Sequence, residues 1–147
     1  MTTAHDVAAY ILDELGPVSA MKLQKLVYYS QAWHLVWEDG MLFEDEIQAW
    51  THGPVIPALF KSHSGKFQLQ AGDIDGDAAA LSTRQQKVVD QVLEFYGDKS
   101  SQWLSDLTHF EAPWKGARRG ISDAARASVE ITPESMMEYY SSLAPIN

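Results

Sequence analysis

The chain of 147 residues contains no cysteine. This absence excludes disulfide bonds and thiolate chemistry, and with them the small secreted scaffolds that disulfides hold together. The first ten residues also lack the basic start and the apolar core of a signal peptide. No uncharged apolar run approaches the roughly 20 residues of a membrane span. We therefore expect a cytoplasmic protein that does not enter a membrane.

Basic side chains are scarce. Eleven Lys and Arg residues stand against 20 Asp and Glu residues, which gives a formal net charge of −9. Nucleic-acid-binding domains need a net positive charge to neutralise phosphates, so the negative charge of this chain makes direct binding of nucleic acid an unfavoured interpretation. Two interpretations of the acidic charge remain open. It either attracts a basic protein partner, because complementary fields raise encounter rates, or it only keeps the protein soluble.

The remaining composition is that of one globular domain. Hydrophobic residues make up 46% of the chain and charged residues 21%, which are ordinary proportions for a folded soluble domain. A chain of this length buries about two-thirds of its unfolded surface, and it shows no internal repeat, low-complexity tract or interdomain linker. We expect residues 1–147 to form a single compact domain.

Helical spacing of apolar residues, together with capping residues at the ends, predicts about six helices. Thr3 with Asp6, and Ser82 with Gln85, have the pattern of a capping box. Thr132 followed by Pro133 is typical of a helix start. The predicted helices cover residues 3–15, 19–38, 55–64, 82–96, 100–110 and 132–143. We expect one further short turn at 114–119.

The helix predicted at 19–38 has apolar residues on nearly every face, which favours a position in the middle of the fold. After it, the turn signal Asp39-Gly40, the apolar segment 41–43 and the alternating residues 47–51 predict a small β-hairpin. Gly53-Pro54 is expected to end that strand. Residues 66–81 are rich in turn formers and predict the longest loop. The fold class is thus mainly α, with a central aromatic-rich helix and a small hairpin.

Four stretches carry a family resemblance. They are Met21 to Leu35, Ile47 to Pro57, Leu107-Thr108-His109, and Pro113 to Arg118. Together they resemble the Panacea-domain family, also called SocA-like antitoxins, whose members partner toxins in toxin–antitoxin pairs. The resemblance covers most of the chain.

The resemblance implies a protein without enzymatic activity or cofactor that binds a cognate toxin and neutralises it by direct contact. It also implies that some members deliver the toxin to a cellular protease. It assigns structural roles in the fold to a set of motif residues: Leu23, Gln24, Tyr29, Trp33, Gly53, Pro54, Pro57, Thr108, His109, Pro113 and Trp114.

Three pairs of residues are candidates for partner contacts. Lys22 and Lys25, three residues apart on a helix, would form one basic edge on an acidic protein. Trp50 and His52 lie at the end of the predicted strand, and aromatic side chains are preferred anchors of protein interfaces. Arg118 and Arg119 form a basic patch after Trp114. For each lysine, a solvated helix start is the alternative interpretation, and for Trp50 it is a place in the core.

Two other classes of function remain as alternatives. Five histidines allow a small metal-dependent hydrolytic enzyme that uses His52, His63 or His109 with a nearby acid. The sequence contains no HExxH pattern, so a structural role for each histidine is favoured and no metal is expected. The alternating Asp73, Asp75 and Asp77 lack the glutamate of a calcium loop and predict a solvated turn. The second alternative is a DNA-binding regulator of its own operon, with the first two helices and the hairpin arranged as a winged helix.

Overall fold

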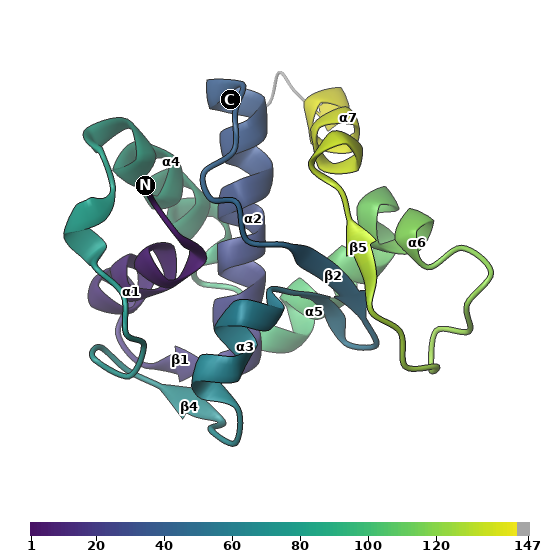
Figure 1. Cartoon of the computed structure of the whole chain (residues 1–147), viewed down its shortest axis with the longest axis horizontal. Helices are drawn as coiled ribbons and strands as arrows, with labels where there is room; N and C mark the ends of the chain where they lie inside the picture. The colour runs from purple at the N-terminus through teal and green to yellow at the C-terminus, as the bar shows by residue number, and fades with distance from the viewer. Residues whose placement is uncertain (144–147) are drawn as a thin grey trace.

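The computed structural model describes residues 1–143. Within these residues it has seven α-helices, one short 3₁₀ helix and two small antiparallel sheets (Figure 1). This confirms the expected mainly α class. The elements are α1 (Ala4–Leu15), β1 (Val18–Ser19), α2 (Ala20–Glu38), β2 (Ile47–Trp50), β3 (Gly53–Val55), α3 (Pro57–His63), β4 (Gln68–Leu69), η1 (Ala78–Ala80), α4 (Thr83–Tyr96), α5 (Ser101–Phe110), α6 (Ala112–Ala117), β5 (Val129–Ile131) and α7 (Pro133–Leu143).

Helix α2 is the centre of the fold, as its sequence predicts. Every residue from Leu23 to Leu35 is buried, and the helix packs against α1, α4, α5 and α7 (Figure 1). A helix that is enclosed on all sides has no need of a polar face, which explains its nearly uniform apolar surface. Trp33 is buried and stacks on Trp37, which is only partly buried, with 5.1 Å between ring centroids.

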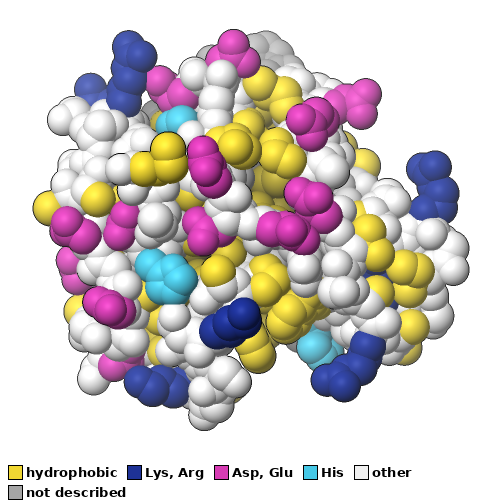
Figure 2. Space-filling view, in the orientation of Figure 1, with side chains coloured by type: hydrophobic (Ala, Val, Ile, Leu, Met, Phe, Trp, Pro, Cys, Tyr) yellow, Lys and Arg dark blue, Asp and Glu magenta, His cyan; other side chains and the backbone are white. Residues whose placement is uncertain are grey.

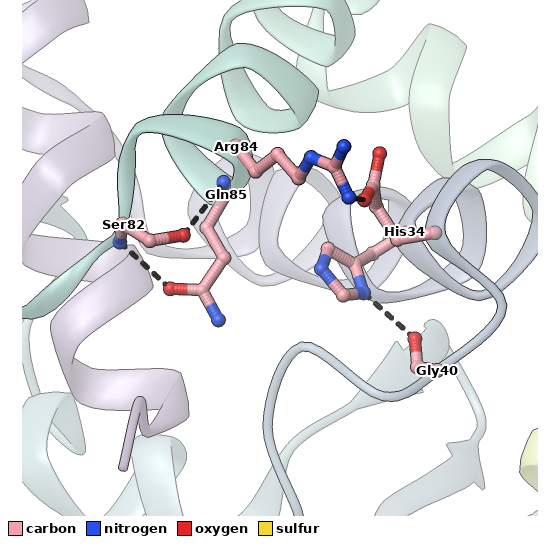
Figure 3. Close-up of polar contacts among 6 residues, drawn as sticks. His34, Gly40, Ser82, Arg84 and Gln85 are labelled. Carbon is pink, nitrogen blue, oxygen red and sulfur yellow. Dashed lines mark hydrogen bonds and ion pairs between the residues drawn. The ribbon is translucent and has the colours of Figure 1, made fainter.

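The predicted helix ends are confirmed where capping residues set them. The Thr3–Asp6 capping box starts α1 and the Ser82–Gln85 box starts α4. In the second box, Ser82 Oγ accepts from the backbone N–H of Gln85 at 3.2 Å, and Gln85 Oε1 accepts from the N–H of Ser82 at 2.9 Å (Figure 3). At the C-terminal end of α2, His34 Nδ1 donates to Gly40 O at 2.7 Å, which closes the turn expected at Asp39-Gly40 (Figure 3).

Replacing Ser82 with alanine is expected to lower the free energy of unfolding by about 1 kcal/mol, because alanine lacks the Oγ that accepts from the backbone N–H of Gln85. Chemical denaturation of the purified chain measures the change. Thr83→Ala is the matched control, since Thr83 lies one position inside the helix and alanine favours the helix. An equal loss in both variants would show that the cap does not stabilise α4.

The hairpin pairs different segments from those that the sequence predicts. Strand β2 pairs with β3 through the turn at Thr51 and His52, and residues 41–43 form no strand. Gly53 and Pro54 therefore continue the sheet instead of ending it, and α3 begins at Pro57, two residues later than predicted. Edge strands tolerate proline because its missing N–H faces away from the ladder.

Two pairings join segments that are distant in sequence. Strand β5 pairs with the other edge of β2. Strand β4 pairs with β1, and both β4 and η1 lie inside the segment 66–81 that is predicted as a loop. The sequence analysis does not predict β1, β4 or β5, because strands of two or three residues are too short for alternation to show. None of the helices within residues 1–143 is both long enough and apolar enough to cross a membrane.

Candidate functional site

The tip of the β2–β3 hairpin is held by side chains from the α5–α6 region. Four successive backbone carbonyls, those of residues 49–52, each accept a hydrogen bond from one of these side chains. We call the four donor residues the hairpin clamp. The pairs are Ser105 Oγ with His52 O (3.0 Å), His109 Nε2 with Thr51 O (2.9 Å), Trp114 Nε1 with Trp50 O (2.8 Å) and Arg118 Nη1 with Ala49 O (2.8 Å).

Helical spacing explains how four residues align with one strand. Ser105 and His109 are four residues apart on α5, so they lie on one face of that helix. Trp114 and Arg118 are again four apart, at α6 and its C-terminal cap. The chain turns between the two pairs at Glu111, and Pro113 lies in the first turn of α6. The His109 and Trp114 rings lie 4.1 Å apart, and the Arg118 guanidinium lies over the Trp114 ring.

The far end of the hairpin is fixed by Gln24 of α2. Its Oε1 accepts from the backbone N–H of Ile56 at 2.8 Å, and its Nε2 donates to Ile56 O at 3.4 Å and to His63 Nε2 at 3.0 Å. Because His63 Nε2 accepts this bond, that nitrogen carries no proton and the imidazole ring is neutral. Burial also lowers the pKa of His63, which favours the uncharged ring.

Only glycine fits at position 53. Its φ angle is +119°, and a Cβ there would lie 2.5 Å from Lys25 Cε and 3.0 Å from Thr108 Oγ1. Both the backbone conformation and the close approach of these two side chains exclude a larger residue. The contact candidate Lys25 and the motif residues Gly53 and Thr108, which are far apart in the sequence, therefore meet beneath the hairpin.

The prediction that Lys25 contacts a partner at the surface is wrong for this structure. The residue is 0% exposed, and Nζ has no hydrogen-bond partner among residues 1–143. Burial lowers the pKa of Lys25 to about 7. The sequence pattern of α2 does not reveal this burial, because it is the hairpin and α5 that cover the helix at Lys25.

The prediction that Arg118 belongs to a surface patch is also wrong. The residue is 3% exposed, and besides Ala49 O it donates to carbonyl oxygens of the loop after α6, those of Ser122, Asp123 and Ala125. Five N–H donors allow one guanidinium to serve several carbonyls, which is why an arginine can be buried here without an acidic partner. Its neighbour Arg119 is exposed, as expected for a surface patch.

Lys22 points away from the hairpin. It is partly buried at the start of α2, and its Nζ donates to Gly97 O, at the end of α4, at 2.7 Å. Burial lowers its pKa. The structure therefore does not join the six predicted contact residues into one surface.

Trp50 and His52 do share a surface. They line a hollow of about 700 Å³ between the hairpin, the start of α2, α3 and the residues before β4, which we call the aromatic groove. Its other main lining residues are Met21, Phe60, Lys66, Phe67 and Arg126. The Trp50 and Phe60 rings lie 5.1 Å apart, and Phe67 is 79% exposed.

The sequence analysis missed Phe60, Lys66, Phe67 and Arg126 as parts of a site. One signal was available for Phe67, which is a large apolar residue in a segment rich in turn formers, where a loop is predicted and no helix face would bury it. Nothing in the sequence places it beside Trp50.

A buried polar cluster supports the motif residues of α2. Glu111 Oε1 accepts from Tyr29 OH at 2.8 Å and from Tyr140 OH at 2.7 Å, and Trp33 Nε1 donates to Tyr96 OH at 3.0 Å. Burial raises the pKa of Glu111 and of these tyrosines, with the two tyrosine hydrogen bonds opposing the shift at Glu111. The cluster joins α2, α4 and α7 to the turn after α5.

The remaining motif residues lie where packing or chain direction requires them. Leu23 is in the core, Pro54 is in β3, Pro57 is the first residue of α3, and Thr108 Oγ1 donates to Ser105 O at 2.7 Å. His109 Nδ1 also bonds Ser105 O, at 2.6 Å. This carbonyl lies in the middle of α5, so these two bonds do not satisfy the free carbonyls at the helix end, contrary to what the sequence suggested. In residues 1–143, no three His, Cys, Asp or Glu side chains lie close enough to hold a metal ion.

Comparison with known protein families gives a match over more than half of the chain. The model of the family described as "Antitoxin SocA-like, Panacea domain" matches residues 23–115. No curated protein and no solved structure matches the chain. The matched range contains the hairpin, α3 and three of the four clamp residues, whereas Arg118 and the groove residues Met21 and Arg126 lie outside it.

Proposed function

The chain belongs to the family of SocA-like antitoxins with a Panacea domain, and on this premise we propose that it binds its cognate toxin directly, through the aromatic groove, and neutralises it by contact. Membership in the family supports a role in a toxin–antitoxin pair. The toxin and the mode of neutralisation belong to the proposal.

The observation that carries the proposal is the fixed position of the hairpin tip beside exposed aromatic side chains. The clamp holds the backbone of residues 49–52 from one side, and Gln24 holds Ile56 from the other. A rigid surface loses little conformational entropy when it binds, so more of the contact energy remains as affinity. Trp50, Phe60 and Phe67 then supply the large apolar contacts that dominate protein interfaces.

The groove would form the centre of a larger contact. A stable interface of ordinary size buries about 1,600 Å² in total, and a few aromatic or arginine anchors carry most of its binding energy. Phe67 is the most suitable residue for a test because it is the most exposed aromatic side chain of the groove. Trp50 is less suitable, since its Nε1 donates to Gln48 and its ring packs on Phe60.

Phe67→Ala is expected to weaken binding of the toxin by about 30-fold, or about 2 kcal/mol, as for a central aromatic anchor. Binding of the purified toxin from the adjacent reading frame, and growth rescue on co-expression, measure the change. Phe110→Ala is the matched control, because Phe110 is an equally exposed phenylalanine (73%) outside the groove. Equal binding by both variants would exclude the groove as the interface.

Delivery of the toxin to a protease is the second role that the resemblance implies. It differs from blocking in what happens to the toxin in the cell. If contact alone neutralises the toxin, its abundance stays unchanged while its activity is lost. A shortened toxin lifetime that depends on this chain would instead indicate delivery.

A further inference from the structure

The aromatic groove has a charge opposite to that of the whole chain. Among its lining residues within 1–143 there is no Asp or Glu, although the chain has 20 acidic residues against 11 basic ones. The ionisable groups that line the groove are Lys66, Arg126, His52 and His63. Figure 2 shows hydrophobic, basic and histidine side chains together in the lower part of this face, where Figure 1 places α3 and the hairpin, and acidic side chains mainly above them.

The two cations of the groove are available to a partner. Arg126 is exposed and makes no ion pair with any residue that the structure describes. Lys66 Nζ lies 4.0 Å from Asp73 Oδ1, but both side chains are partly exposed to water, and such a pair contributes at most about 1 kcal/mol. A carboxylate of a partner would therefore meet one unpaired guanidinium and one weakly paired ammonium.

We infer that the aromatic groove binds a segment of the partner protein in which Asp or Glu residues flank a large apolar side chain. This inference rests on the proposed function, since it describes the part of the toxin that enters the same groove. The apolar side chain packs against Phe60, Phe67 and Trp50, and the carboxylates lie beside Lys66 and Arg126. Arginine holds carboxylates through two parallel hydrogen bonds, which adds specificity.

The size of the groove limits the part of the partner that enters it to a short segment, while the rest of the proposed interface surrounds the groove. A hollow of about 700 Å³ holds a few side chains, within the range of sites that enclose small ligands. The acidic surface elsewhere on the chain would repel a partner that is acidic throughout. The acidic groups of the partner are thus expected to be confined to the inserted segment.

A library of random peptides of about twelve residues, selected on the immobilised full chain, tests this specificity without the toxin. We expect enriched peptides to carry acidic residues on both sides of Phe, Trp, Leu or Ile. Their affinity should fall by about tenfold in the double variant Lys66→Glu with Arg126→Glu, and should also fall at high salt. Enriched peptides that are neutral or basic, or that bind the double variant equally well, would overturn the inference.

The matched control is the double variant Arg84→Glu with Lys87→Glu. It reverses the charge of one arginine and one lysine, as the test variant does, but both residues are exposed on α4 and lie outside the groove. An equal loss of peptide binding in the control would show that net charge, not the groove, governs affinity. The chain could also bind a second copy of itself through the groove. Self-association that is lost in the double variant Lys66→Glu with Arg126→Glu would show this and would overturn the inference of a toxin segment.

The two proposals fail in different experiments. If Phe67→Ala abolishes growth rescue while Lys66→Glu with Arg126→Glu leaves it intact, the groove binds the toxin without acidic specificity. If acidic peptides bind but no toxin is neutralised, the specificity of the groove stands and the antitoxin role fails.

Discussion

Lys25→Met is expected to raise the free energy of unfolding at pH 7 by roughly 3 to 5 kcal/mol. The side chain of Lys25 is fully buried without a hydrogen-bond partner in the described part of the chain, so the folded protein either desolvates an ammonium or releases its proton. Methionine has a similar length and no charge to desolvate. Urea or guanidinium denaturation of both proteins measures the difference.

The pH dependence of this stability difference shows whether the buried ionisable group of Lys25 causes it. The pKa of Lys25 is about 7 in the folded chain and 10.5 in the unfolded chain. Between these values the unfolded chain binds more protons, so the stability of the wild type rises with pH from about 7 to about 10. Below pH 7 both states are protonated and the full penalty remains. The advantage of Lys25→Met should therefore shrink steadily as the pH rises towards 10.

Lys87→Met serves as the control for this variant, because Lys87 is exposed on α4. Its effect on stability is expected to stay within about 0.5 kcal/mol at every pH. If the gain in Lys25→Met were absent, or did not change with pH, Lys25 would not be buried as the structure shows.

Arg118→Ala is the second variant with a large expected effect, a loss of about 3 kcal/mol in the free energy of unfolding. The guanidinium connects Ala49 O of β2 with the carbonyls of the loop that follows α6. Removing it leaves these acceptors without their donor and opens a space beneath the sheet. Thermal and chemical denaturation measure the loss.

The neighbouring residue provides a control of identical chemistry. Arg119 is exposed, and Arg119→Ala should change stability by no more than about 0.5 kcal/mol. Because the hairpin clamp positions Trp50 and His52, Arg118→Ala should also weaken toxin binding under conditions where the variant remains folded. Two arginine variants of equal stability would contradict the clamp.

The parts of the fold that could be predicted are those that depend on neighbours in sequence. The boxes Thr3–Asp6 and Ser82–Gln85 set the starts of α1 and α4, and Pro133 marks the start of α7. The apolar residues of α2 predicted its central place. Helix hydrogen bonds and caps join residues three or four apart, so the information for them is local.

The family resemblance located the motif residues but did not separate contact residues from structural ones. Lys25 and Arg118 look like surface cations in the sequence, yet each lies beneath the hairpin. Whether a lysine on a helix reaches water depends on what packs over it, and here Gly53 and Thr108, which are distant in the sequence, do so. Long-range packing of this kind leaves no periodic signal along the chain.

What the sequence determined by itself is a cysteine-free, acidic, mainly helical domain with α2 at its centre, because composition and short-range spacing suffice for these properties. Only the tertiary structure decided that His109, Trp114 and Arg118 hold the hairpin backbone, and that Trp50, Phe67 and Arg126 line one groove. Those residues come from segments joined by strand pairing and helix packing, and such contacts form only when the whole chain has folded.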